Sequence, residues 1–131
     1  MKKWLQLIFV LGVVLGLSSP IETMAYGYGY NVEVQAGGYR KGSSQVKKLD
    51  YDSAAVTPHS GLNPAYVTHR VRFSVGGGLA TEYVDVYRNG VTYHMYYYPN
   101  MARKGDYYIL ATSMDAGQSV SSARVSGLWM P

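Results

Sequence analysis

The chain has 131 residues and no cysteine, so disulfide bonds, thiolate metal ligands and cysteine nucleophiles are all excluded. Charged residues make up only 15% of the composition, and the basic ones are scattered along the chain. A nucleic-acid interface needs a basic patch or stripe, so nucleic acid is not an expected partner. The almost unbroken apolar run Leu5–Leu17 is well short of the roughly 20 residues of a membrane-spanning helix. We therefore expect no stable membrane insertion.

Motifs that would indicate an enzyme or a metal site are missing as well. The sequence has no G-x-S-x-G elbow, and its histidines His59, His69 and His94 show neither H-x-H nor H-E-x-x-H spacing. His69 falls on the apolar side of an expected strand, where a partly buried, hydrogen-bonded imidazole is the more common outcome. We predict no catalytic residues, no metal ligands and no cofactor, and hence a protein that is not an enzyme.

The beginning of the chain has the layout of a cleaved export signal. Lys2 and Lys3 form a positive start, the apolar run Leu5–Leu17 follows, and Pro20 comes after it. Thr23–Ala25 then places small residues at the two positions that a signal peptidase reads. The sequence therefore predicts a signal peptide at residues 1–25 and a secreted, extracellular protein that begins at Tyr26.

Residues 26–131 have the size and charge of a single, mildly basic domain. They contain ten basic and seven acidic residues, which is a net charge of +3. This length is typical of a domain with one core, and no composition change divides it. The small positive charge favours a weak attraction to anionic cell walls or membranes.

Residue types and their spacing predict an all-β fold. All 14 tyrosines lie after Ala25, and tyrosine, valine and threonine favour strands. Apolar residues do not recur at helical spacing, and short alternating runs separated by Gly, Asn and Pro are present instead. The expected strands are Tyr30–Ala36, Ala65–Val75, Thr81–Arg88, Val91–Tyr98, Tyr107–Met114, Ser119–Trp129 and, more weakly, Gln45–Tyr51. The expected connections between these strands are Gly37-Gly38, Thr57–Pro64 and Gly76–Gly78. We predict a small antiparallel β-sandwich of six or seven strands.

Asn89-Gly90 separates two strand-like runs and is the strongest local signal, because Asn-Gly favours a two-residue hairpin turn. This turn would place Asp85 opposite His94. One face of the hairpin then reads as core, with Val84, Val86, Tyr93 and Met95. The other face is aromatic and polar, with Tyr83, Asp85, Tyr87, Thr92, His94, Tyr96 and Tyr98.

The polar face of this hairpin supplies the candidate binding residues Tyr83, Asp85, Tyr87, His94, Tyr96 and Tyr98. Asp85 and His94 are the only expected acid–imidazole pair, but no nucleophile or second carboxylate accompanies them, which favours a stabilising cross-strand pair over catalysis. The tyrosines could form a sugar-binding platform, a protein contact or ordinary sheet surface. The sequence leaves open which face of the hairpin is buried.

Trp129 is the only tryptophan after Ala25. A large ring so close to the end of a chain is useful only when it packs, because chain ends fray unless something holds them. We predict that Ser119–Trp129 is an interior or well-paired strand and that Trp129 is buried.

The last part of the chain carries a family resemblance, in the runs Tyr107–Ala111, Gln118–Ser122 and Val125–Pro131. It resembles the ending of an uncharacterised group of small, secreted, cysteine-free proteins of Gram-positive bacteria. In overall plan the chain is similar to lactococcin-972-like bacteriocins. The resemblance implies a secreted β-sandwich that acts against neighbouring bacteria, and it assigns no site residues.

These observations favour a secreted, non-enzymatic protein that binds at a bacterial surface, with a bacteriocin-like activity as the most specific form. The expected partner is a cell envelope component or another protein. The alternative is a structural or extracellular matrix protein that self-associates, because long β-rich runs with little charge, such as Val91–Tyr98, can pair with another chain.

Overall fold

The structure is a computed structural model and describes residues 27–41 and 44–131. The expected signal peptide at residues 1–25 lies outside the described residues, as does Tyr26. The described residues form nine strands and no helix. The strands are β1 (Tyr28–Gln35), β2 (Tyr39–Lys41), β3 (Val46–Lys47), β4 (Ala54–Ser60), β5 (Val67–Phe73), β6 (Val84–Val86), β7 (Tyr93–Met95), β8 (Tyr107–Ser113) and β9 (Ser122–Met130). This part of the chain has no helix that is long and apolar enough to span a membrane.

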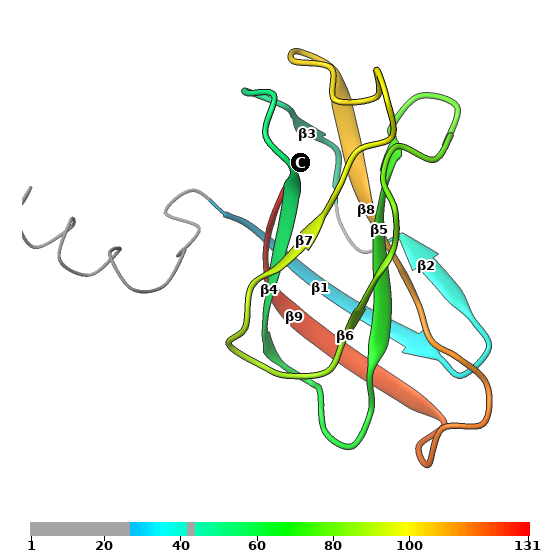
Figure 1. Ribbon diagram of the computed structural model, residues 1–131. Helices are drawn as coiled ribbons and strands as arrows, with labels where there is room; N and C mark the ends of the chain where they lie inside the picture. Colours follow the sequence, from blue (N-terminus) through cyan, green and yellow to red (C-terminus); the bar gives the residue numbers. More distant parts are fainter. Residues whose placement is uncertain (1–26, 42–43) are drawn as a thin grey trace, which may run out of the picture.

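The strands form two antiparallel sheets that appear as two layers in Figure 1. The first sheet has the order β1-β9-β4-β7. The second sheet has the order β2-β8-β5-β6, and β3 pairs with β8 as well. The expected all-β class is therefore confirmed, while the expected six or seven strands were too few.

One hydrophobic core contains side chains from both sheets. In β1 the residues Tyr30, Val32 and Val34 are buried and alternate with exposed neighbours, as the sequence pattern predicts for a strand with one wet face. Val67 and Val71 of β5 contribute from the second sheet. Strand β8 is buried over most of its length, as its continuous apolar run indicates.

Strand β9 confirms the prediction for the end of the chain. It lies between β1 and β4 and pairs with both, so it is an interior strand. Ala123, Val125 and Trp129 are buried on its inner side, and the Trp129 side chain has no exposed surface. The last strand therefore helps to organise the first sheet.

Strand β4 corrects an expectation, because Thr57–Pro64 was predicted as a connection. Pro58 has no N–H for a sheet and usually marks a loop or an edge. Here Pro58 lies opposite Gly127 of β9, and the register shifts directly after it. A Cβ atom at Gly127 would collide with the Thr57 carbonyl oxygen and lie 2.8 Å from Pro58 Cα. The missing side chain of Gly127 thus allows β9 to approach β4 closely at this point. β7 pairs with β4 only as far as Val56, so Pro58 lies beyond that ladder, where the N–H that it lacks is not needed.

The expected hairpin across Asn89-Gly90 is wrong. β6 pairs with β5 in the second sheet, whereas β7 pairs with β4 in the first. Asp85 consequently lies opposite Thr68, and His94 lies opposite Ala55. Only the base of the expected hairpin is paired, by an isolated bridge between Thr81 and Tyr97.

Contacts from a distant segment explain why the hairpin opens. A two-residue type I′ turn needs positive φ at both central residues, but only Gly90 of this pair has it, at 81°. The Asn89 side chain instead binds the main chain of Leu62, with its Oδ1 3.3 Å from Leu62 N and its Nδ2 3.2 Å from Leu62 O. Gly90 N donates to Pro58 O over 2.6 Å. These bonds hold the 89–90 turn against the end of β4.

Candidate anion-binding site

The opened hairpin divides the six candidate residues between the two sheets. Val86 of β6 and Met95 of β7 are both buried in the common core. Neighbouring residues on a strand point to opposite faces, so Asp85 and His94 point outward from different sheets. The two groups of candidates, Tyr83, Asp85 and Tyr87 on one side and His94, Tyr96 and Tyr98 on the other, do not form one surface. The expected pairing of Asp85 with His94 is therefore corrected.

Asp85 and Tyr87 contact residues of β5 and of the segment before it. Asp85 Oδ1 accepts a hydrogen bond from the Thr68 hydroxyl over 2.6 Å. The Tyr87 ring stacks on Tyr66, with the ring centroids 4.9 Å apart. The Tyr66 hydroxyl donates to Asp115 over 2.8 Å. This end of the second sheet is a hydrogen-bonded aromatic cluster with two acidic residues.

The other three candidates lie along the β7 segment. His94 Nδ1 is 3.3 Å from the Ser53 hydroxyl, and its ring is stacked with Tyr96 at a centroid distance of 6.5 Å. Tyr96 is 63% exposed, and Tyr98 is 38% exposed with its main-chain N bound to Ala80 O. This group has aromatic surface but no concentration of charge.

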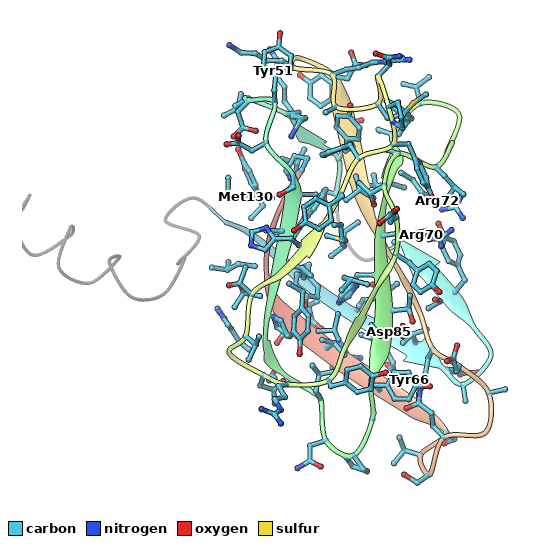
Figure 2. All side chains as sticks on the ribbon, viewed as in Figure 1. Tyr51, Tyr66, Arg70, Arg72, Asp85 and Met130 are labelled. Atoms are coloured by element: carbon cyan, nitrogen blue, oxygen red, sulfur yellow. The ribbon has the colours of Figure 1, made fainter. Side chains whose placement is uncertain are left out.

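Two arginines of β5 form the most distinctive polar feature, and they were not among the candidates from the sequence. His69 and Val71 point into the core, so Arg70 and Arg72 lie on the outer face of the second sheet. Figure 2 shows both arginines on the side of β5 away from β4 and β9, with Asp85 and Tyr66 farther along the same side.

Each arginine is stacked on a tyrosine from another part of the chain. The Arg70 guanidinium carbon lies 5.4 Å from the ring centroid of Tyr83, and that of Arg72 lies 5.3 Å from Tyr39. Such contacts hold a guanidinium plane in place while its edge stays free to bind. Tyr83 is thus a predicted candidate that contacts a charged group, although by a route that the sequence did not indicate.

A small hollow of about 250 Å³ lies between the arginines and the edge of the sheet. We call it the arginine hollow, and its lining residues are Tyr39, Arg70, Arg72, Ala111, Thr112 and Ser113. None of these residues is acidic. Ala111 lies opposite Arg70 in the pairing of β5 with β8. Its small side chain leaves space in the hollow next to the long side chains of Arg70 and Arg72.

The hydrogen-bond donors of the arginine hollow are largely unused within the described part of the chain. Arg72 Nη1 donates to Gly77 O over 2.9 Å, but its Nε is buried and has no partner there. Arg70 makes no hydrogen bond or ion pair among the same residues. Its guanidinium has a cation–π contact with the Tyr83 ring. Asp85 lies opposite Thr68 on the same face but bonds to the Thr68 hydroxyl, and no carboxylate lines the hollow. Guanidinium groups that are not paired with a carboxylate are suited to binding an anion.

Lys48 is a cation with a structural role, and its surroundings differ from those of the two arginines. Its side chain is fully buried, and Nζ donates to Asp52 O over 2.7 Å, Pro131 O over 3.1 Å and Asp50 Oδ1 over 3.3 Å. The ammonium also lies 4.5 Å from the ring centroid of Tyr97. Burial lowers the pKa of Lys48, and the Asp50 carboxylate opposes this change. Lys48 joins segments that are far apart in sequence.

His69 is confirmed as a hydrogen-bonded imidazole, and it is fully buried where partial burial was expected. Its Nδ1 is 2.9 Å from the Thr112 hydroxyl and its Nε2 is 3.4 Å from the Tyr30 hydroxyl. Burial lowers the pKa of His69 to about 3, so the ring is neutral at physiological pH. Nowhere in residues 27–41 and 44–131 do three or more histidine or acidic side chains gather as metal ligands would.

Comparisons with protein-family models, with curated proteins and with solved structures find no match.

Proposed function

We propose that the protein is an exported β-sandwich that binds, without catalysis, at a bacterial surface through the arginine hollow. The observation that carries this proposal is a hollow with two guanidiniums and no acidic lining residue, in which neither guanidinium forms an ion pair within the described residues. Bacterial envelopes are rich in anionic polymers, which offer such a site many equivalent ligands. The net charge of +3 after Ala25 adds a weak long-range attraction.

A bacteriocin-like activity is the most specific form of this proposal. The resemblance of the terminal runs to small secreted Gram-positive proteins supports it, as does the layout of residues 1–25. In this form the protein binds the envelope of a neighbouring cell and inhibits its growth.

Sedimentation with purified bacterial cell walls tests the proposed binding. Residues 26–131 are mixed with walls at several salt concentrations, and the retained fraction is compared among wild type, Arg70→Ala and Arg88→Ala. Arg88 is exposed and lies outside the arginine hollow, so its variant has the same change in net charge. We expect retention that decreases with salt, a large loss for Arg70→Ala and no loss for Arg88→Ala.

Absence of retention at low salt would overturn the proposal, as would equal losses in the two variants. Spotting the protein on lawns of related bacteria tests the bacteriocin-like form separately. Clear zones that Arg70→Ala does not produce would support it, and uninhibited growth alongside normal wall binding would restrict the function to adhesion.

Self-association is the second candidate function, and the edge of β1 favours it. β1 has eight residues, pairs with β9 without a register shift and contains neither lysine nor proline. Within the described residues no strand pairs with its other edge. The other outer strands β2, β3, β6 and β7 have at most three residues each. Long, uninterrupted edges can add a strand from another chain, whereas short edges discourage it.

Light scattering after size-exclusion chromatography tests this candidate. Asn31 is exposed on β1, so Asn31→Lys places a charge on the edge, whereas Val75→Lys makes the same charge change at an exposed position after β5 of the second sheet. A dimer or larger assembly that Asn31→Lys alone dissociates would support self-association. A monomer at high concentration would eliminate it.

A further inference from the structure

We infer that the arginine hollow binds a phosphate group, an assignment that rests on the proposed envelope binding and narrows it to one ligand chemistry. Three properties of the hollow favour phosphate: the number of donors that converge on it, their geometry and the size of the space. The phosphate could be free, part of a polymer or part of a lipid headgroup, and the chemistry of recognition is the same in each case.

The number of free donors favours phosphate over carboxylate. A guanidinium presents a planar fork of N–H groups, and one fork is enough to satisfy the two oxygens of a carboxylate. The arginine hollow has two guanidiniums on alternate residues of one strand, separated by roughly 7 Å along the backbone. A phosphate group has more oxygens than a carboxylate and can accept from both arginines at once.

Hydroxyl groups at the same place extend this donor set. Ser113 and Tyr39 line the hollow and lie opposite each other in the pairing of β2 with β8. Neither hydroxyl has a hydrogen-bond partner within the described residues, so both can donate to an anionic oxygen. Tyr39 also holds Arg72 from the side, so one residue orients the guanidinium and adds a donor.

The dimensions of the hollow restrict the ligand further. A volume of about 250 Å³ is below the usual range of roughly 300–1,000 Å³ for sites that enclose a drug-sized molecule. The hollow therefore suits one small charged group at a time. It lies on the outer face of the second sheet, so a polymer that carries the phosphate can extend past Tyr83 or Tyr39 on either side.

The test is an NMR titration of the purified protein with four probes. These are inorganic phosphate, a glycerol-phosphate polymer, polyglutamate of equal charge, and phosphatidylcholine vesicles that contain phosphatidylglycerol. We expect phosphate to shift the amide signals of Arg70–Arg72 and Ala111–Ser113. Arg70→Ala and Arg72→Ala should weaken binding at least tenfold, and Arg88→Ala should leave it unchanged.

Lysine variants separate the fork geometry from the charge. Arg70→Lys and Arg72→Lys keep the net charge and the outward position, so they should fold normally. We expect each to bind phosphate several-fold more weakly than wild type, because an ammonium cannot form two parallel bonds to one group. Phosphate binding equal to wild type in both lysine variants would contradict the proposed geometry.

Three results would overturn the phosphate assignment: equal binding of polyglutamate and the glycerol-phosphate polymer, equal weakening by Arg88→Ala, or shifts confined to signals away from the hollow. A comparison of the polymer with the vesicles identifies the source of the phosphate, since either can support the assignment. Wall retention that depends on Arg70 without any response to phosphate would refute this inference and leave envelope binding intact. A specific phosphate response without wall retention would refute the proposed function instead.

Discussion

Lys48 and Arg70 are both cations on the same small domain, yet their surroundings are opposite. Lys48 is fully buried, and its ammonium donates to two main-chain oxygens and one carboxylate. Arg70 lies on the outer face of β5 and makes neither a hydrogen bond nor an ion pair within the described residues, and only the Tyr83 ring holds it. One cation has every donor occupied by the fold, and the other keeps its donors free.

The difference separates structural polar groups from groups that can bind a ligand. Removing a buried cation leaves buried acceptors without a donor, which costs stability. Removing a half-buried arginine whose guanidinium the fold does not use as a donor costs less stability. We therefore expect large stability effects at the buried residues Lys48 and Trp129, and large binding effects at the arginine hollow.

The largest expected stability effect is that of Trp129→Ala. The ring has no exposed surface and lies in the core, so its removal should lower the free energy of unfolding by about 3 to 5 kcal/mol. Urea denaturation followed by circular dichroism measures the change. Leu49→Ala is the control, because Leu49 is 65% exposed and should shift the midpoint little. A loss below about 1 kcal/mol at Trp129 would contradict the described packing.

Lys48→Ala should have the next largest effect, because it leaves the oxygens of Asp52 and Pro131 without this donor. We expect a loss of about 2 to 3 kcal/mol in the free energy of unfolding. Lys47→Ala removes the same charge from an exposed neighbour and should change stability by less than about 0.5 kcal/mol. Similar midpoints for the two variants in denaturant would mean that Lys48 has no structural role.

His69 predicts a dependence of stability on pH. Its pKa is about 3 in the folded protein and 6.5 as the ordinary value, so below pH 6.5 the unfolded chain takes up a proton that the folded protein does not. The contribution is complete above pH 6.5 and is lost as the pH falls toward 3. Lowering the pH from 7.5 to 5 should cost about 2 kcal/mol. The slope should be smaller in His69→Gln, and an equal slope in both proteins would contradict the buried neutral imidazole.

The smallest stability effect is expected at the arginine hollow. Arg70→Ala should change the free energy of unfolding by less than about 0.5 kcal/mol, since the fold does not use this guanidinium as a donor. The same variant should lose most of its retention on cell walls. Melting curves and sedimentation of the same variant measure stability and binding separately. A large loss of stability in Arg70→Ala would mean that Arg70, like Lys48, has a structural role.

Local patterns in the sequence predict those strands whose position does not depend on contacts with distant segments. The alternation at Tyr30–Val34 predicts the buried side of β1, and the apolar residues of Ser119–Trp129 predict the inner side of β9. The pattern fails at Pro58, because β7 pairs with β4 only as far as Val56 and the N–H that proline lacks is not needed beyond that point. It fails at Asn89 because the side chain bonds to Leu62, which is 27 residues away. Both failures depend on long-range contacts that a local pattern does not contain.

The candidate site was predicted less completely than the fold. Alternation along Ala65–Val75 already places Arg70 and Arg72 on the polar side of a strand, which was the available signal. The tyrosines that hold them come from β2 and from the segment before β6, and their proximity depends on the order of strands in the second sheet. Tyr83 was predicted from the turn at Asn89-Gly90, but the structure places it beside Arg70 because β6 pairs with β5.

Wall retention of Arg70→Ala relative to Arg88→Ala, measured at one low salt concentration on folded protein, tests the central claim most directly. Both variants lose one positive charge, so general electrostatic attraction affects them equally. We expect Arg88→Ala to sediment with the walls as wild type does, while Arg70→Ala stays mostly in the supernatant. Equal sedimentation of the two variants would contradict the claim that the arginine hollow is the binding site.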